Sequence, residues 1–413
     1  MEFQDPTLLA LINEAIANNP DLHLAAARWE EARARVRVAS SALWPQVDAV
    51  GSANRLGNGG FSQPGAPGTF NQYIVGAQVS WELDVWGRLR SGVAASEASA
   101  EAVRLDYEMA RLSLASAVAD AWFVAIQARQ QLAIDQEHLA AEQRTARITG
   151  DKVNVGAGNG PLDAELAQAN VRLAADAIQR DQQAIEETRR ALEVLLGRYP
   201  ANELEIAAHL PALPGETPAG LPSELLERRP DIVAADRDVA AAFHSTESAK
   251  AARLPRVTLS ASLGSLIDPT ERIWSTGADL LGPLFTGGRL TAEIDIATAQ
   301  QKQAIAAYVS TAIAAFQEVE SALANEQYLE RRQDELEQAT ARMAEASRVG
   351  EDRYEAGMLS IVDLNVIRQQ DFDSQSLLLQ IQTDRLRERL RLYRALGGNF
   401  EVPAERTAAV AGS

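Results

Sequence analysis

The chain has 413 residues and a net charge of −18, because 57 acidic side chains outnumber 39 basic ones. This acidity argues against nucleic acid as a partner, since the phosphate backbone requires clustered positive charge. The chain has no cysteine, which excludes disulfides, thiolate metal sites and a thiol nucleophile. A composition rich in Ala, Leu, Glu, Gln and Arg favours helices. There is no run of about 18 apolar residues, so no transmembrane helix is predicted.

Short motifs recur in one order along the chain and predict a tandem repeat. Five pairs lie 200 to 210 residues apart: Asn19-Pro20-Asp21 with Arg229-Pro230-Asp231, Trp44-Pro45 with Leu254-Pro255, Gly87-Arg88-Leu89 with Gly288-Arg289-Leu290, Leu162-Asp163 with Val362-Asp363, and Leu196-Gly197 with Leu396-Gly397. Single dipeptide matches arise by chance, but this colinearity does not. We expect a first structural repeat at 1–210, a second at 211–400 and a C-terminal tail at 401–413.

Each repeat begins with helices and continues with two segments of strand-like alternation. The helices stop at Pro45 and Pro255, because proline cannot continue a helix. In Tyr73–Val85 the odd positions are apolar and most even positions are polar, which is the period of a strand with one apolar face. We predict one hairpin in each repeat, with strands at about 46–56 and 73–86 and at about 256–266 and 273–285.

A very long helix follows each hairpin. Residues 88–153 contain no proline, and apolar residues spaced seven apart predict a coiled-coil stripe: Leu105, Leu112, Ala119, Ile126 and Ala133. Such a helix would be on the order of 100 Å long, far longer than an ordinary domain requires. We predict long helices at about 88–153 and 289–355, each followed by a glycine-containing turn and a return helix, at 161–197 and 361–397.

The four predicted strands point to a membrane. A sheet of four strands cannot close into a barrel and would leave two unpaired edges. Strands of about ten residues with one apolar face suit a transmembrane β-barrel completed by other copies of the chain. Tryptophans near the strand ends would then form an interfacial girdle: Trp44, Trp81, Trp86 and Trp274. The alternative is that these tryptophans pack a soluble sheet.

Several of these motifs together resemble a known family. They are Asn19-Pro20-Asp21, Trp81-Glu82-Leu83-Asp84-Val85-Trp86-Gly87-Arg88, Arg353-Tyr354-Glu355-Ala356-Gly357 and Val362-Asp363-Leu364. With the tandem order of hairpins and long helices, they make the chain similar to TolC-type outer-membrane efflux channels over nearly its whole length. Within that family the chain is closest to the OprM/NodT-like lipoprotein branch of tripartite RND pumps.

The resemblance implies a mainly α fold with a membrane β-barrel. Three chains of four strands would form a homotrimer with one twelve-stranded β-barrel, and their helices would form an α-helical barrel in the periplasm of a Gram-negative cell. Most members of this branch begin with a lipid-modified cysteine. The sequence has none, so either it was removed or this member lacks it; Met1-Glu2-Phe3 and Gly412-Ser413 look like cloning-site remnants.

The resemblance also implies a function and its partners. The expected function is a passive exit duct for drugs or other small solutes. The expected partners are outer-membrane lipid, a periplasmic adaptor (membrane fusion) protein and an inner-membrane RND-type transporter. Two alternatives stay open, namely the exit duct of a type I protein secretion system and a soluble coiled-coil scaffold without a pore.

The turns between long and return helices hold the candidate functional residues. Small residues there would let an adaptor approach the backbone closely: Gly156, Gly158, Gly160, Pro161, Gly357 and Ser360. By the resemblance, the gate residues are Asp163, Tyr354 and Asp363. In a trimer the aspartates would form acidic rings, and the Tyr354 hydroxyl could bond a carboxylate of the neighbouring turn. The alternative for Asp163 and Asp363 is a charge that only complements the helix dipole.

The sequence departs from the family pattern at two gate positions. Leu359 stands where TolC has an arginine, and Val366 stands where a second acidic ring is expected, so the contacts that close the gate should differ.

No catalytic residue, metal site or cofactor is predicted. The four histidines show no ligand spacing: His23, His138, His209 and His244. No nucleophile elbow or metalloprotease motif occurs. The many carboxylates that stand beside arginine on helices are expected to be solvated faces. Energy for transport would therefore come from a partner.

Overall fold

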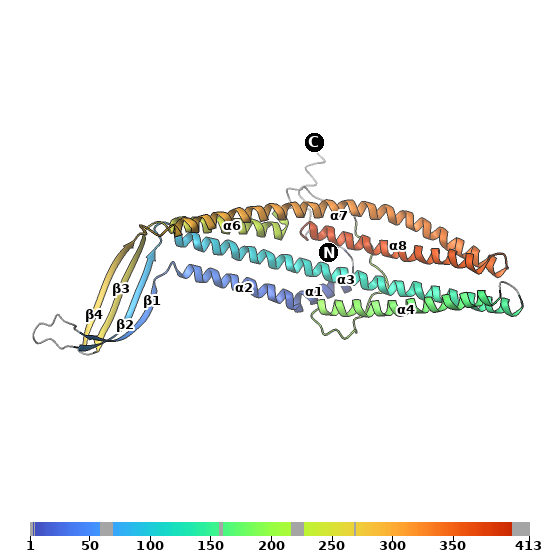
Figure 1. Cartoon of the computed structure of the whole chain (residues 1–413), viewed down its shortest axis with the longest axis horizontal. Coiled ribbons are helices and arrows are strands. Elements are labelled where there is room, and N and C mark those ends of the chain that lie inside the picture. Colours follow the sequence, from blue (N-terminus) through green and yellow to red (C-terminus); the bar gives the residue numbers. More distant parts are fainter. Residues whose placement is uncertain are drawn as a thin grey trace, which may run out of the picture. The chain divides into compact units, whose positions relative to one another are not determined.

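The computed structural model describes residues 3, 5–57, 69–156, 160–215, 227–267 and 270–398. It is mostly helical with one four-stranded sheet (Figure 1). In chain order the elements are α1 (Pro6–Asn18), α2 (Pro20–Ser41), β1 (Gln46–Gly57), β2 (Thr69–Leu83), α3 (Arg88–Asn154), α4 (Pro161–Leu195), α6 (Pro230–Ala251), β3 (Arg256–Ile267), β4 (Thr270–Leu281), α7 (Arg289–Glu355) and α8 (Ile361–Ala395). Both halves run from a helix through a hairpin to a long helix and a return helix. This order agrees with the predicted fold class. The boundary at residue 210 stays a prediction, and the tail at 401–413 lies outside the described residues.

The chain divides into two compact units. The helical unit contains Met1–Leu24, Glu108–Arg229 and Ile313–Ser413, and the sheet unit contains Ala25–Tyr107 and Pro230–Ala312. The long helices α3 and α7 contribute to both units. Each has 67 residues, so each is about 100 Å long.

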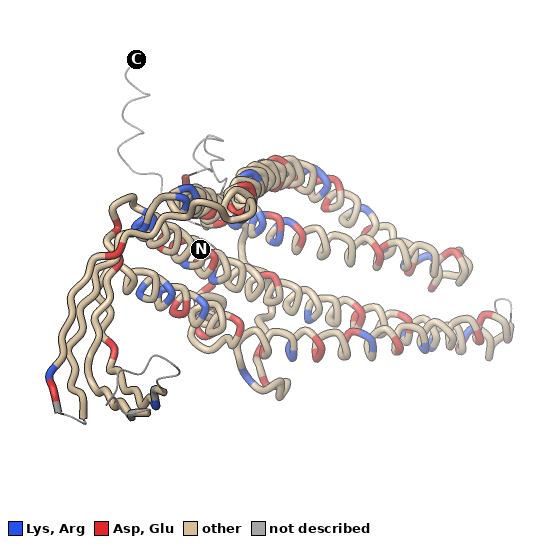
Figure 2. The backbone as a smooth tube through the Cα atoms, turned by 60° about the vertical axis from the view of Figure 1, so that its left-hand side comes forward, with Lys and Arg blue, Asp and Glu red and all other residues tan. Residues whose placement is uncertain are grey.

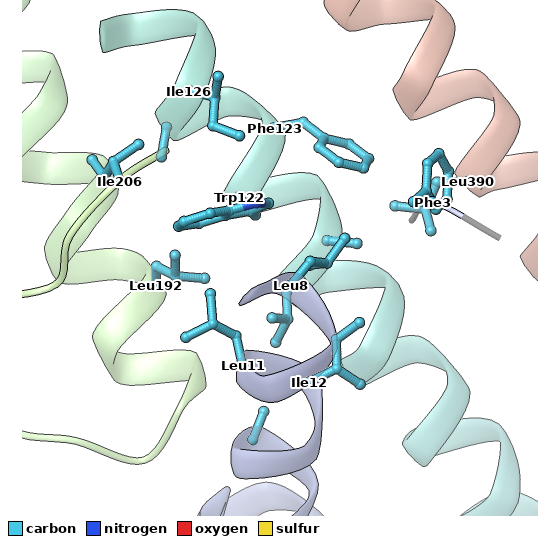
Figure 3. Close-up of a cluster of buried hydrophobic side chains, with 14 of the residues drawn as sticks. Phe3, Leu8, Leu11, Ile12, Trp122, Phe123, Ile126, Leu192, Ile206 and Leu390 are labelled. Carbon is cyan, nitrogen blue, oxygen red and sulfur yellow. The ribbon is translucent and has the colours of Figure 1, made fainter. Parts of the chain in front are cut away.

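The core of the helical unit forms where α1 packs against α3 and α4 (Figure 3). Trp122 and Phe123 of α3 are fully buried there, together with Leu8 of α1 and Leu192 of α4. The Trp122 indole Nε1 donates to the Asp5 carboxylate at 2.9 Å, and the same carboxylate caps the N-terminus of α1. Two large aromatic side chains thus bury their surface while the one polar atom of the indole keeps a partner.

The apolar stripe of α3 follows the heptad spacing only in part. Ala119 and Ile126 are buried, Leu112 is half-buried and Ala133 is exposed. By length and composition, α3 is the one helix of the described residues with a segment apolar enough to cross a membrane, although polar residues interrupt that segment. Since 44% of that segment is buried inside the structure, it also fits a core helix.

The recurring motifs meet one another in space within the helical unit. Asn19 caps α2, and its side-chain Nδ2 donates to the carbonyl of Leu195 at the end of α4 at 2.9 Å. In the second half, Arg229 donates to the carbonyl of Ala395 at the end of α8 at 3.0 Å. Gly197 has a φ of +74°, and a Cβ there would approach the backbone of α1 to 2.4 Å. The Pro-Asp and Leu-Gly motifs therefore recur because the residue before each Pro-Asp joins the start of its half to the end of that half.

The sheet unit arranges β1, β2, β3 and β4 in sequence order with antiparallel pairing. The two hairpins join through β2 and β3, where Trp81 lies opposite Leu259. Strand β2 begins at Thr69, before the predicted start at 73, because its pairing with β1 continues to Gly57. Strand β4 ends at Leu281, before the predicted end at 285. Among the described residues, β1 and β4 each pair along one edge only.

An acidic motif after β2 connects the sheet to α3. The Asp84 carboxylate accepts hydrogen bonds from the amides of Leu89 and Arg90, both at 2.9 Å, and so caps the first turn of α3. The Arg88 guanidinium donates to both carboxylate oxygens of Glu82, each at 2.8 Å. These contacts explain why carboxylates stand at both positions of the sequence motif.

Candidate functional site

One face of the sheet is apolar and exposed. Residues that lie directly opposite in paired strands point to the same face, and the register places Val47 beside Val79, Val79 beside Ala261, and Leu263 beside Trp274. Val47, Leu263 and Trp274 are 65–74% exposed. The opposite face carries serine, threonine, glutamine and carboxylate side chains at the alternate positions. The sheet therefore has one face suited to lipid and one suited to water.

The structure places the four expected interfacial aromatics in the sheet unit: Trp44, Trp81, Trp86 and Trp274. Trp81 and Trp274 lie within β2 and β4, whereas Trp44 and Trp86 lie just beyond strand ends. The Trp86 indole donates to the carbonyl of Pro255 at 2.7 Å, and the Trp81 indole donates to the carbonyl of Leu43 at 3.0 Å. The indole nitrogens of Trp81 and Trp86 are thus hydrogen-bonded, while the two residues lie near and just beyond the end of β2.

The turns that end the long helices lie in the helical unit. Gly156, Gly160 and Gly357 have φ values of +73° to +74°, the left-handed region that favours glycine. A Cβ at any of these three positions would meet nothing within 4 Å, so only the backbone demands glycine. Pro161 starts α4, where its missing N–H is not needed. Gly158 lies outside the described residues.

The two equivalent aspartates occupy different environments. Asp163 lies in the first turn of α4 and is 8% exposed. Asp363 is exposed in the first turn of α8, where its amide donates to the Ser360 hydroxyl at 3.1 Å and that hydroxyl donates to its carboxylate at 2.7 Å. Asp363 and Ser360 therefore form a capping arrangement within one turn.

Tyr354 joins α7 to α3. It is 5% exposed, and its hydroxyl lies 2.6 Å from the Thr149 hydroxyl. The Thr149 proton goes to the carbonyl of Thr145 at 2.7 Å, so Tyr354 must donate to Thr149. The Lys152 ammonium donates to the Tyr354 carbonyl and lies 3.9 Å from its ring centroid. We call Thr149, Lys152 and Tyr354 the α3–α7 latch. The carboxylate partner expected for Tyr354 is replaced by a hydroxyl, because α3 rather than the neighbouring turn lies beside the ring.

Arg368 of α8 ties three helices together one turn from the latch. It is 5% exposed, and its guanidinium bonds Glu351 of α7 at 2.6 Å and the carbonyl of Ala141 of α3 at 3.2 Å. It also donates to the Thr145 hydroxyl and lies 3.7 Å from Glu142, which is 3% exposed. This buried network fixes α8 against α3 and α7.

Sequence reasoning missed Arg368 because charged residues occur along all the long helices (Figure 2). Nothing in the local pattern separates a buried arginine from a solvated one. The expectation that the carboxylates beside arginine are solvated is wrong for Glu142. The available signal was the position of Arg368 seven residues after the buried Ile361, on the same side of α8.

No group of metal-ligating side chains is found among the described residues. What the arrangement offers is mechanical: hydrogen bonds and one buried arginine hold the ends of two helical hairpins together. The sheet offers an exposed apolar face, and its outer strands β1 and β4 each pair along one edge within the described part of the chain.

Comparison with known proteins places the chain. Residues 11–198 and 221–398 match the family described as outer membrane efflux protein. The chain belongs to this family. The pyoverdine export outer membrane protein OpmQ of Pseudomonas putida is 31% identical across 97% of this chain and 87% of its own length. The probable efflux pump outer membrane protein TtgC of Pseudomonas putida is 32% identical across 96% of this chain and 84% of its own length.

Solved structures of outer membrane efflux proteins share the fold. The outer-membrane channel OprN superposes with a TM-score of 0.89 at 29% identity, across 96% of this chain and 91% of that one. The CmeC outer membrane channel of Campylobacter jejuni gives 0.91 at 25% identity, across 99% and 89%. The predicted family, fold class, export function and Gram-negative outer-membrane location are thereby confirmed. The chain is an outer-membrane exit duct for efflux.

Proposed function

We propose that the duct is a homotrimer whose three sheets close one twelve-stranded barrel. The observation that carries this proposal is the sheet itself, with one apolar exposed face and with β1 and β4 each paired along one edge. An edge strand of one copy would pair with the opposite edge of the next, which removes all exposed edges. The three helical units would then form a periplasmic α-barrel with the hairpin ends at its inner opening.

Cysteine cross-linking tests this assembly, because the chain contains no native cysteine. In every variant one cysteine replaces Ser52 on β1, and a second cysteine replaces one β4 residue, tried at each position from 274 to 280. We expect one β4 position to give a covalent trimer in lipid, with conductance across planar bilayers. The two single-cysteine chains are the controls and should give no covalent trimer. Both the barrel and the duct would be contradicted if the protein were a monodisperse monomer in plain buffer and conducted no ions across planar bilayers.

We propose that the gate lies at the hairpin ends and that Asp163, Tyr354 and Asp363 take part in it. The support is that Tyr354 holds α7 on α3 near these ends and that the Asp363 carboxylate is exposed, with the Ser360 hydroxyl as its hydrogen-bond donor. Three copies of Asp363 near one axis would repel one another and attract cations. In the same bilayers, Asp363→Asn is expected to weaken cation preference.

We propose that a periplasmic adaptor docks on the turn glycines. Gly357→Asn adds bulk but keeps the turn, because asparagine tolerates a positive φ; export should fail while the trimer still assembles. The matched control is Gly288→Asn in the sheet unit, where φ is +85° and a Cβ likewise meets nothing within 4 Å. Drug sensitivity of cells and native gels of the trimer give the two readouts. Normal export by Gly357→Asn would rule out close docking at this turn.

We base our proposals for the cargo and for the partner pump on the family. Named relatives export pyoverdine or belong to a cation efflux system, and for this chain we propose small solutes delivered by an RND-type transporter that supplies the energy. Lipid attachment near the N-terminus stays a prediction. Sensitivity profiling of a deletion strain with drugs, metals and bile salts would identify the cargo class; export of a protein substrate would instead favour a type I secretion duct.

A further inference from the structure

Two buried carboxyl groups meet between α3 and α4 in the helical unit. Asp135 of α3 is 1% exposed and Asp181 of α4 is 6% exposed. Oδ2 of each has no hydrogen-bond partner among the described residues, and one guanidinium, that of Arg180, lies 3.8 Å from a carboxylate oxygen of both groups. Two ionised carboxylates accept but cannot donate, so burying both with one oxygen of each unpartnered would be costly. The arrangement is satisfied when one of them keeps its proton and donates to the other.

The surroundings supply little positive charge. The guanidinium of Arg180 lies 3.8 Å from each carboxylate, but its side chain is 70% exposed and therefore mostly solvated. Gln131 of α3 donates to Asp135 Oδ1 at 2.9 Å, and α8 contributes the neutral Ser376 hydroxyl, which bonds the same amide.

His138, one turn further along α3, contacts other side chains than Asp135 and Asp181. His138 Nε2 faces Glu142 at 3.6 Å, and the His138 ring stacks on Phe372 of α8 with centroids 4.6 Å apart.

Burial and then the neighbouring Asp135 raise the pKa of Asp181 to about 7, although Arg180 acts in the opposite direction.

We propose that Asp135 and Asp181 form a proton-controlled joint between α3 and α4, closed while the pair shares a proton and loosened when that proton leaves. Arg180 lines a cavity of about 490 Å³ between α3, α4 and α8, which gives the pair a route for proton exchange. The joint lies in the hairpin that ends at the α3–α7 latch. Any effect on conduction therefore rests on the proposed gate, whereas the loosening of the hairpin does not.

The direction of the pH effect follows from linkage. The joined state holds a proton that the separated state has released once the pH exceeds about 4, the ordinary range of an aspartate. The proton stabilises the joint fully in acid, and this stabilisation is lost as the pH rises to about 7, by up to tenfold in the joining equilibrium per pH unit. Above that pH the joint stays loosened without further change.

Hydrogen exchange on the intact protein in lipid tests the joint. The exchange of peptides covering 131–142 and 174–188 is compared at about pH 5.5 and about pH 8, after correction for the pH dependence of the intrinsic exchange rate. Between about pH 5.5 and about pH 7 the protection should then fall by up to tenfold per pH unit. The parent should lose at least tenfold protection at the higher pH. Asp181→Asn should show no such change, because its amide donates to Asp135 without a titrating proton.

Asp176→Asn is the matched control, since this carboxylate is exposed on the same helix; it should keep the pH response of the parent. If Asp181→Asn does not assemble, Asp135→Asn replaces it with the same expectation. Equal protection of the parent at both pH values would overturn the proposal, as would an unchanged pH response in the asparagine variant. Exchange needs no transport, so either result leaves the test of the duct separate.

Discussion

Arg368→Met should open the hairpin ends and strongly lower the stability of the helical unit. Arg368 is 5% exposed, lies 2.6 Å from Glu351 and 3.7 Å from the buried Glu142, and is the nearer of two arginines to Glu351, since the exposed Arg144 lies 3.8 Å away. Removing one partner of a buried ion pair leaves the other charge without compensation, at a cost of about 3–5 kcal/mol. We expect a lower free energy of unfolding and higher single-channel conductance, measured by denaturant titration of the trimer and in planar bilayers.

Two further variants separate the buried network from general loss of charge. Arg348→Met removes an exposed arginine of α7 whose ion pairs in the described part of the chain are with Glu345 and Asp352 of the same helix, and its stability should stay close to that of the parent. Neutralising Glu142 and Glu351 to glutamine together with Arg368→Met should recover most of the loss, because no charge is then left buried alone. A conductance of Arg368→Met equal to that of the parent would place the closing contacts elsewhere.

Tyr354→Phe should raise single-channel conductance by removing the hydroxyl of the α3–α7 latch. The lost bond joins two neutral hydroxyls and contributes about 0.5–1.5 kcal/mol, less than a bond to a carboxylate would. The phenyl ring keeps its contact with Lys152, which lies 3.9 Å from the ring centroid in the parent. An effect of about 1 kcal/mol per chain corresponds to roughly fivefold in an opening equilibrium, and three copies acting together would multiply it.

Tyr328→Phe is the matched control, because Tyr328 lies on the same helix and is 64% exposed. Its conductance should equal that of the parent. Thr149→Val removes the other half of the bond, so the double variant with Tyr354→Phe should be no leakier than either single variant. Additive effects of the two changes would show that the hydroxyls act independently and that the latch does not exist as described.

The elements could be predicted because their signals are local. The proline-free segment at 88–153 predicts a long helix that the structure ends at Asn154, and the alternation in 73–85 predicts a strand whose one face is apolar. The start of β2 at Thr69 was missed, because pairing with β1 extends a strand into residues with no pattern of their own. Periodicity reports which face of an element is apolar, but not where a neighbouring strand stops.

The candidate site was only half predictable, for a similar reason. A positive φ at Gly357 and the place of Asp363 in the first turn of α8 are local features of the chain. The partner of Tyr354 is not local, because Thr149 precedes it by 205 residues and reaches it only through the packing of α3 on α7.

Sequence by itself therefore determined the helices, strands and repeated motifs of this efflux duct, as well as its family. Tertiary structure alone decided which charges are buried. Arg368 and Asp181 look like any other charged residue on a long helix, and the 5–6% exposure of each results from helices distant in sequence that lie beside them. Burial is what gives an ion pair or a shared proton its energy, since water screens the same groups when they are exposed.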